Sequence, residues 1–149
     1  MQVVDRRLFV RSSRILAQHQ EKIMPLVRID LQRGKDAAYR QQISAVVHEA
    51  LVSVGVPKKD RFQVVAEHDS GDFVFDPDYL DIRRTDQLVI VQITWNEGRS
   101  IEQKKTLYQT IADGLHSTLG LRREDVLINL VEVKKENWSF GNGIAQYAT

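Results

Sequence analysis

Residues 26–31 (LVRIDL) recur as residues 88–93 (LVIVQI), and this repeat decides the fold. A second pair follows in the same order, since residues 55–67 (GVPKKDRFQVVAE) recur as residues 120–132 (GLRREDVLINLVE). A long amphipathic run separates the two segments of each copy. Each copy therefore predicts strand, helix, strand. Residues present in both copies are expected to serve the fold, and residues found in only one copy are candidates for function.

The periodicity of the apolar residues supports this duplicated unit. Val27, Ile29 and Leu31 alternate with polar residues, which is the pattern of a half-buried strand. A helical crossover should place the two strands of each copy parallel. The sequence thus predicts an α/β (α+β) fold, with two helices on one face of a four-stranded mixed sheet. Helices are expected over 37–54 and about 100–119, and strands over 26–31, 62–66, 88–94 and 126–133.

Composition limits the partners of the chain. Its 149 residues fit one domain, and a net charge of +1 argues against a nucleic-acid surface or a charged membrane surface. The chain has no cysteine, and no apolar run approaches the roughly 20 residues that span a membrane. A cytoplasmic protein is the simplest expectation. The strands are too apolar for one layer of helices to cover both faces of the sheet, so an oligomer is expected.

Two segments lie outside the repeat. Residues 1–24 are Arg-rich, and three interpretations stay open: translation that starts at Met24, a genuine helical or disordered extension, or an organelle transit peptide. Residues 25–149 are expected to be the functional domain, with repeats at about 25–67 and 87–133 and a C-terminal tail. Residues 68–86 carry six aspartates without the spacing of an EF-hand, so we expect a solvated loop with a short strand and no metal site.

Pro25 is the first candidate for chemistry, because copy two has Gln87 in its place. A proline can begin a strand for purely structural reasons. However, if translation starts at Met24, removal of that methionine would leave Pro25 with a free secondary amine. A buried amine near an arginine is pushed toward its neutral form, and it could act as an acid or a base near pH 7.

Four motifs carry a resemblance to a known family. They are Met24-Pro25 ahead of the first strand, residues 60–63 (DRFQ), residues 97–100 (EGRS) and residues 137–143 (NWSFGNG). Together they resemble the tautomerase superfamily, and in particular its malonate semialdehyde decarboxylase-like branch. The resemblance implies a homotrimer of duplicated units, an N-terminal proline at the centre of each active site, a small oxo acid as substrate, and no cofactor.

The resemblance also implies roles for individual residues. Pro25 matches the catalytic proline, and Asp60 matches the aspartate that holds or activates water in the decarboxylases. Arg99 matches one of two arginines that bind the substrate carboxylate. The other arginine is missing, because residues 96–98 read NEG at the place where it is expected. A clamp on the carboxylate with a single arginine weakens a strict decarboxylase assignment.

Aromatic residues complete the expected pocket. Trp138 and Phe140 match residues that wall the pocket, and Phe62 is expected to contact the substrate. The internal repeat leaves an alternative open for the charged residues, since Asp60 pairs with Asp125 and Arg99 pairs with Lys35. An acid and a base at these places could be turn chemistry shared by both copies.

Two functions compete on this evidence. The first is an enzyme that moves protons on, or decarboxylates, a small oxo acid. The second is a catalytically silent oligomer of the same fold that retains the extension, in which Pro25 is an ordinary tertiary amide without a basic nitrogen.

Overall fold

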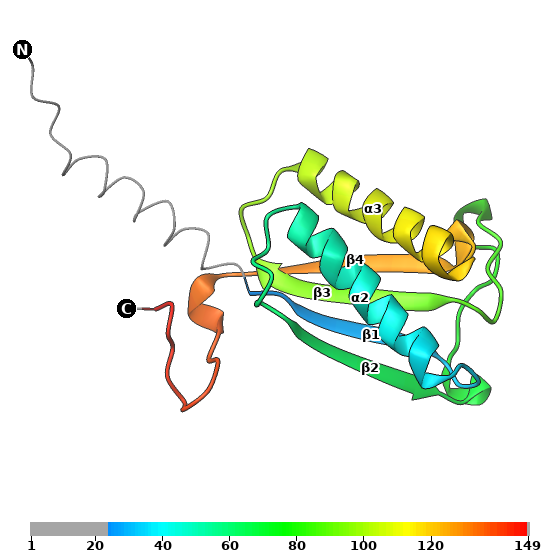
Figure 1. Cartoon of the computed structure of the whole chain (residues 1–149), viewed down its shortest axis with the longest axis horizontal. Coiled ribbons are helices and arrows are strands. Elements are labelled where there is room, and N and C mark those ends of the chain that lie inside the picture. The colour runs from blue at the N-terminus through cyan, green and yellow to red at the C-terminus, as the bar shows by residue number, and fades with distance from the viewer. Residues whose placement is uncertain (1–23, 149) are drawn as a thin grey trace, which may run out of the picture.

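The computed structural model describes residues 24–148, and these form four strands and two long helices (Figure 1). Every helix and strand expected from the repeat is confirmed to within about two residues at each end. Within the described residues, no helix is long and apolar enough to cross a membrane. The elements are β1 (Leu26–Gln32), α2 (Ala37–Ser53), β2 (Phe62–His68), β3 (Val89–Asn96), α3 (Ile101–Leu119) and β4 (Val126–Val133).

The strands form one mixed sheet in the order β2-β1-β3-β4. The two strands of each repeat are parallel, and β1 is antiparallel to β3. The two repeats are therefore related by an approximate twofold axis between β1 and β3. Because of this arrangement, the start of β1 lies beside the start of β2 and the end of β3: Leu26 is in register with Phe62 on one side and with Thr94 on the other.

Both helices begin with a side-chain cap. Asp36 accepts a hydrogen bond from the Tyr39 backbone N–H at 2.8 Å, and Ser100 forms a reciprocal capping box with Gln103. The second helix ends at Gly120, whose φ of 67° is left-handed and favours glycine. These local signals fix where the helices begin and end.

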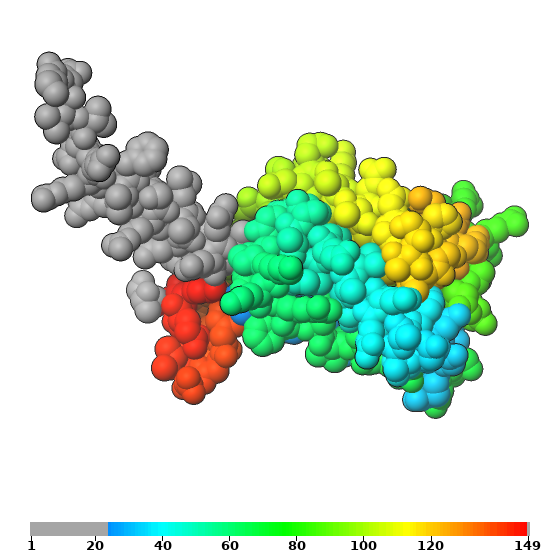
Figure 2. Space-filling model, viewed as in Figure 1, coloured from blue at the N-terminus to red at the C-terminus, as the bar shows by residue number. Residues whose placement is uncertain are grey.

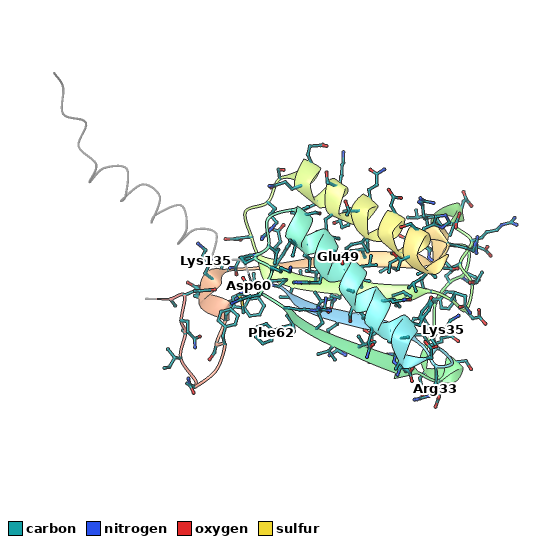
Figure 3. All side chains as sticks on the ribbon, in the orientation of Figure 1. Arg33, Lys35, Glu49, Asp60, Phe62 and Lys135 are labelled. Atoms are coloured by element: carbon teal, nitrogen blue, oxygen red, sulfur yellow. The ribbon has the colours of Figure 1, made fainter. Side chains whose placement is uncertain are left out.

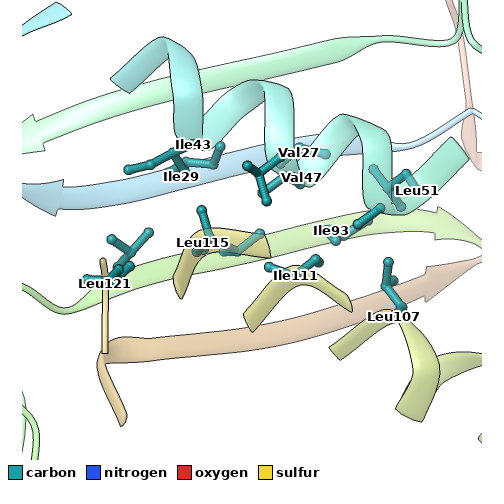
Figure 4. Packing of buried hydrophobic residues seen from close by; sticks show 14 of the residues in the cluster. Val27, Ile29, Ile43, Val47, Leu51, Ile93, Leu107, Ile111, Leu115 and Leu121 are labelled. Carbon is teal, nitrogen blue, oxygen red and sulfur yellow. The ribbon is translucent and has the colours of Figure 1, made fainter. Parts of the chain in front are cut away.

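The two helices cover the same face of the sheet and enclose the core (Figures 1 and 4). They approach each other closely: a Cβ atom added to Gly114 on α3 would lie 2.7 Å from Cγ1 of Val46 on α2. The alternating strand residues that face the helices are fully buried, as the sequence predicts. The core includes Val27, Ile29, Ile43, Val47, Leu51, Val91, Ile93, Trp95, Leu107, Ile111 and Leu115.

The other face of the sheet has no layer of helices over it. Five apolar side chains of β1, β2 and β4 on this face are between 36% and 51% exposed: Leu26, Phe62, Val64, Leu127 and Val131. An apolar sheet face of this kind is unfavourable in water. It therefore supports the expectation that this surface meets another subunit.

The segment between the repeats differs from the expectation in one respect. The short strand expected within 68–86 is wrong: beyond His68, where β2 ends, the segment contains two short 3-10 turns, Ser70–Asp72 and Tyr79–Asp81, and no strand until β3. Phe73 is buried, and its ring lies 5.8 Å from that of His68 and 6.0 Å from that of Phe75. Aromatic packing, rather than pairing in a ladder, holds the part of this segment around Phe73 and Phe75.

Candidate active site

The topology brings the predicted site residues to one end of the sheet. Pro25 directly precedes β1, Asp60 precedes β2 by two residues, and Arg99 follows β3 by three. Figure 3 shows Asp60 and Phe62 at this end, with the opposite end marked by Arg33 and Lys35. Pro25 and Arg99, which are 74 positions apart in the sequence, therefore lie at the same end of the sheet because β1 runs antiparallel to β3.

A cavity of about 210 Å³ opens at this end. Pro25 is buried in its wall, and most of the remaining surface is apolar or aromatic. Four of the six predicted site residues lie in this lining, whereas Asp60 and Arg99 lie at the same end of the sheet but outside the lining. The lining consists of Met24, Pro25, Leu26, Phe62, Trp138, Ser139 and Phe140.

Arg99 is held on two sides. Its Nη1 donates a hydrogen bond to the Asn96 carbonyl oxygen at 2.7 Å, and its guanidinium carbon lies 3.9 Å from the centre of the Trp95 ring. Burial lowers the pKa of Arg99 from its usual value, and Glu132 opposes this shift. The guanidinium stays charged in spite of this. Its Nη2 is buried and makes no hydrogen bond within residues 24–148, so these donors of the guanidinium are left unused by the described part of the chain.

Asp60 lies half-buried in the turn between α2 and β2. Its backbone N–H donates to the Pro57 carbonyl oxygen at 3.0 Å. The same turn is tied to the helix, because Nε2 of the buried His48 lies 2.9 Å from the Lys58 carbonyl oxygen and can only donate to it. His48 therefore has a packing role, and the backbone that carries Asp60 is well fixed.

The C-terminal tail supplies the aromatic wall, and it forms a separate orange-to-red lobe at this end of the molecule (Figure 2). The Trp138 and Phe140 rings stack with centres 5.3 Å apart and planes 15° apart. The Trp138 indole N–H donates to Oδ1 of Asn96 at 2.7 Å. Gln146 closes the tail on itself by accepting from the Phe140 N–H at 2.9 Å and donating to the Gly141 carbonyl oxygen at 3.0 Å.

Sequence reasoning missed three residues that hold this site: Trp95, Asn96 and Gln146. A signal for the first two was present in the repeat. Copy one reaches its glycine, Gly34, three positions after residue 31, whereas copy two reaches Gly98 five positions after residue 93. The two extra residues fall in the segment that contains Trp95 and Asn96. Gln146 acts only within the folded tail and left no comparable signal.

Comparisons with known proteins agree with this arrangement. Two family models, both described as tautomerase enzyme, match residues 25–83 and 60–141. The probable tautomerase YusQ of Bacillus subtilis (strain 168) is 43% identical over 124 residues, which are 83% of this chain and 98% of that protein. The probable tautomerase YrdN of the same organism is 35% identical over 127 residues, which are 85% of this chain and 98% of that protein.

Among solved structures, the chain is similar to two malonate semialdehyde decarboxylases. A malonate semialdehyde decarboxylase, solved in wild-type, mutant and inactivated forms, superposes with a TM-score of 0.76 at 32% identity, covering 82% of this chain and 95% of that one. FG41 malonate semialdehyde decarboxylase inhibited by 3-bromopropiolate also gives 0.76, at 36% identity, with coverages of 82% and 93%. The sequence matches and the fold lead to one conclusion: this chain belongs to the tautomerase family of enzymes.

Proposed function

We propose that this protein is a cofactor-independent enzyme that uses Pro25, as a free N-terminal amine, to move protons on a small oxo acid or to decarboxylate it. The observation that carries the proposal is the burial of Pro25 in the wall of the cavity. Two further facts support it. One family match begins at residue 25, and the curated relatives are matched over 98% of their own length by 83–85% of this chain.

Each neighbouring residue has a proposed role. The Arg99 guanidinium binds the substrate carboxylate through Nη2, which is buried and has no hydrogen bond within the described part of the chain. Asp60 positions water or assists the proline amine. Phe62, Trp138 and Phe140 exclude bulk solvent from the reacting carbon, which strengthens the electrostatic contacts inside the cavity.

Two reactions fit this set of groups. In a tautomerisation, the neutral Pro25 amine removes a proton from the carbon next to the substrate carbonyl, and the proton is returned to the enolate oxygen. In a decarboxylation, the cationic amine polarises the carbonyl, the bond to the carboxylate breaks, carbon dioxide leaves, and the resulting enolate is protonated. The two decarboxylase neighbours support the second reaction, and the absence of a second arginine in residues 96–98 favours the first.

The proposed active form is a homotrimer. The exposed apolar face of the sheet needs a partner, and a neighbour of the same fold, a fused 4-OT, is described as a symmetric trimer (TM-score 0.68, 21% identity). Sheets that meet face to face around a threefold axis would cover the exposed side chains of β1, β2 and β4.

The test compares two forms of the protein, one that begins at Pro25 and the full chain of 149 residues. We expect the first form to tautomerise an oxo acid such as phenylpyruvate and to lose this activity on Pro25→Ala. The full chain should be far less active, because an amide nitrogen is not basic. Mass spectrometry of the natively expressed protein identifies which form the cell makes. Equal activity of both forms would refute the role of Pro25 as a free amine. No activity of the shorter form on several oxo acids would instead favour a silent oligomer that retains residues 1–24.

A further inference from the structure

Asn96 is a buried polar residue that contacts both the aromatic wall of the proposed substrate site, through Trp138, and its arginine, Arg99. It is the last residue of β3, it is 4% exposed, and it is in register with Val133 of β4. Its side-chain oxygen accepts from the Trp138 indole at 2.7 Å, and its backbone oxygen accepts from Arg99 Nη1 at 2.7 Å. Burying an amide is costly unless its hydrogen bonds are made, so a residue of this type at the edge of a cavity calls for an explanation.

We infer that Asn96 is a positioning residue that fixes Trp138 and Arg99 relative to each other, and that its neutral amide keeps the charge of Arg99 available to an anionic substrate. The inference about the substrate rests on the proposed function. The contact between Asn96 and the indole is independent of it.

The first part of the inference concerns the aromatic wall. Trp138 lies in the tail beyond β4, where no strand pairing holds the backbone in the described residues. The indole hydrogen bond joins this tail to β3 across 42 residues of sequence. Because Trp138 stacks on Phe140, fixing the plane of one ring also fixes the plane of the other. Asn96 therefore sets the shape of the cavity without lining it.

The second part concerns charge. An aspartate at position 96 could still accept from the indole, but it would place a carboxylate beside the guanidinium that the backbone of the same residue already holds. That carboxylate would compete with the substrate for Arg99. The low exposure of the site would strengthen its attraction to the guanidinium. A neutral acceptor performs the positioning without this competition.

Tryptophan fluorescence tests the positioning directly in the full-length chain. The chain has two tryptophans, and Trp95 is fully buried, so quenching by acrylamide reports mainly on Trp138. Asn96→Ala should make this emission more accessible to acrylamide, and Asn96→Asp should leave it at the parental value. Gln92→Ala is the matched control: it removes another side-chain bond between β3 and β4, to Asn129 at 3.0 Å, and should change nothing.

Kinetics with phenylpyruvate, on each variant with the N-terminus that the cell leaves, test the consequence for the substrate. Loss of one hydrogen bond in Asn96→Ala should lower kcat/KM by about 3- to 10-fold. Asn96→Asp should raise KM with little change in kcat, which a purely structural role would not do. Trp138→Phe keeps an aromatic ring in the cavity wall but removes the indole N–H together with part of the ring system, so it should lower kcat/KM at least as much as Asn96→Ala, even where Asn96→Ala folds poorly.

The outcomes separate the two proposals. Unchanged acrylamide quenching in a folded Asn96→Ala, or parental kinetics in Trp138→Phe, would overturn the positioning role. A parental KM in Asn96→Asp would overturn the role of the neutral amide. If the parent turns over no oxo acid at all, the proposed function fails, and the quenching result alone decides whether Asn96 positions Trp138.

Discussion

Asp125 accepts two hydrogen bonds from Thr85, one from its backbone N–H at 2.6 Å and one from its hydroxyl at 2.7 Å. Asp125 is fully buried, and Thr85 lies near the end of the segment that joins the two repeats. In copy two, the acid before the last strand thus anchors this segment. The equivalent acid in copy one is Asp60, which lies beside the cavity. The same sequence position has a structural role in one repeat and a proposed catalytic role in the other.

Removing Asp125 should mainly lower stability, whereas removing Asp60 should mainly lower activity. Asp125→Ala should lower the free energy of unfolding by about 3 kcal/mol or more, because each hydrogen bond to a carboxylate contributes about 1.5–3 kcal/mol. Asp60→Ala should change stability by less than about 1 kcal/mol and lower the activity on oxo acids. Urea unfolding and initial rates measure the two effects. Similar losses of stability in both variants would show that Asp60 is also a structural anchor.

Tyr39 makes the stability of the fold sensitive to alkaline pH. Burial raises the pKa of its hydroxyl above the usual value, and the charge of Asp125 raises it further. Because the folded pKa lies above the unfolded one, the contribution of Tyr39 is complete below about pH 10 and is lost as the pH rises through the folded pKa. Tyr39→Phe should therefore reduce the loss of unfolding free energy between pH 9 and 11. An unchanged pH profile would mean that Tyr39 ionises equally well in the folded protein.

Most of the fold could be predicted from local patterns. Strand alternation and helix capping are encoded within a few residues, and the internal repeat showed each pattern twice. The exception was the segment around Phe73, Val74 and Phe75, whose alternation resembles a strand. There Phe73 packs on His68 and Phe75 packs on Phe73, and no neighbouring strand pairs with the backbone, which only the folded chain reveals.

The site was less predictable, because its supporting contacts link distant residues. Pro25, Arg99 and the tail aromatics could be selected from motifs. The repeat marks the segment that contains Asn96, but the role of Asn96 could not be predicted, since it depends on an indole 42 residues away. The contact between Arg99 and Trp95 likewise depends on how the chain turns after β3.

Gly114 tests the close packing of the two helices. In an isolated helix, Gly→Ala stabilises by about 1 kcal/mol, but here the new Cβ would lie 2.7 Å from Cγ1 of Val46, whose χ1 angle is stiff. Gly114→Ala should therefore destabilise the protein, by about 1 kcal/mol. In a Val46→Ala background the same change should be stabilising, because the clash is gone. Chemical unfolding of the parent and the three variants completes the cycle, and a stabilising Gly114→Ala in the parent would contradict this packing.

Arg99→Ala should raise KM for a small oxo acid and leave the fold intact. Loss of one charge-assisted contact corresponds to about 1.5–3 kcal/mol, or roughly 10- to 150-fold in kcat/KM. Arg99→Lys should recover only part of this loss, since an ammonium cannot reproduce the fork or the stacking on Trp95. Arg33→Ala, at the opposite end of the sheet, is the control and should have parental kinetics (Figure 3). Parental kinetics in Arg99→Ala would refute its binding of the substrate carboxylate.

The uncovered face of the sheet predicts how the subunits associate. Leu127 on β4 is 38% exposed on this face, whereas Val74 is 90% exposed on the segment between the repeats. Leu127→Lys should dissociate the oligomer, because it would bury an unpaired charge between subunits, which is strongly unfavourable. Val74→Lys adds the same charge away from the sheet and should leave the assembly unchanged. Sedimentation velocity at micromolar concentration distinguishes the two results. A monomeric parent, or an intact oligomer in Leu127→Lys, would show that the subunits do not meet through this face.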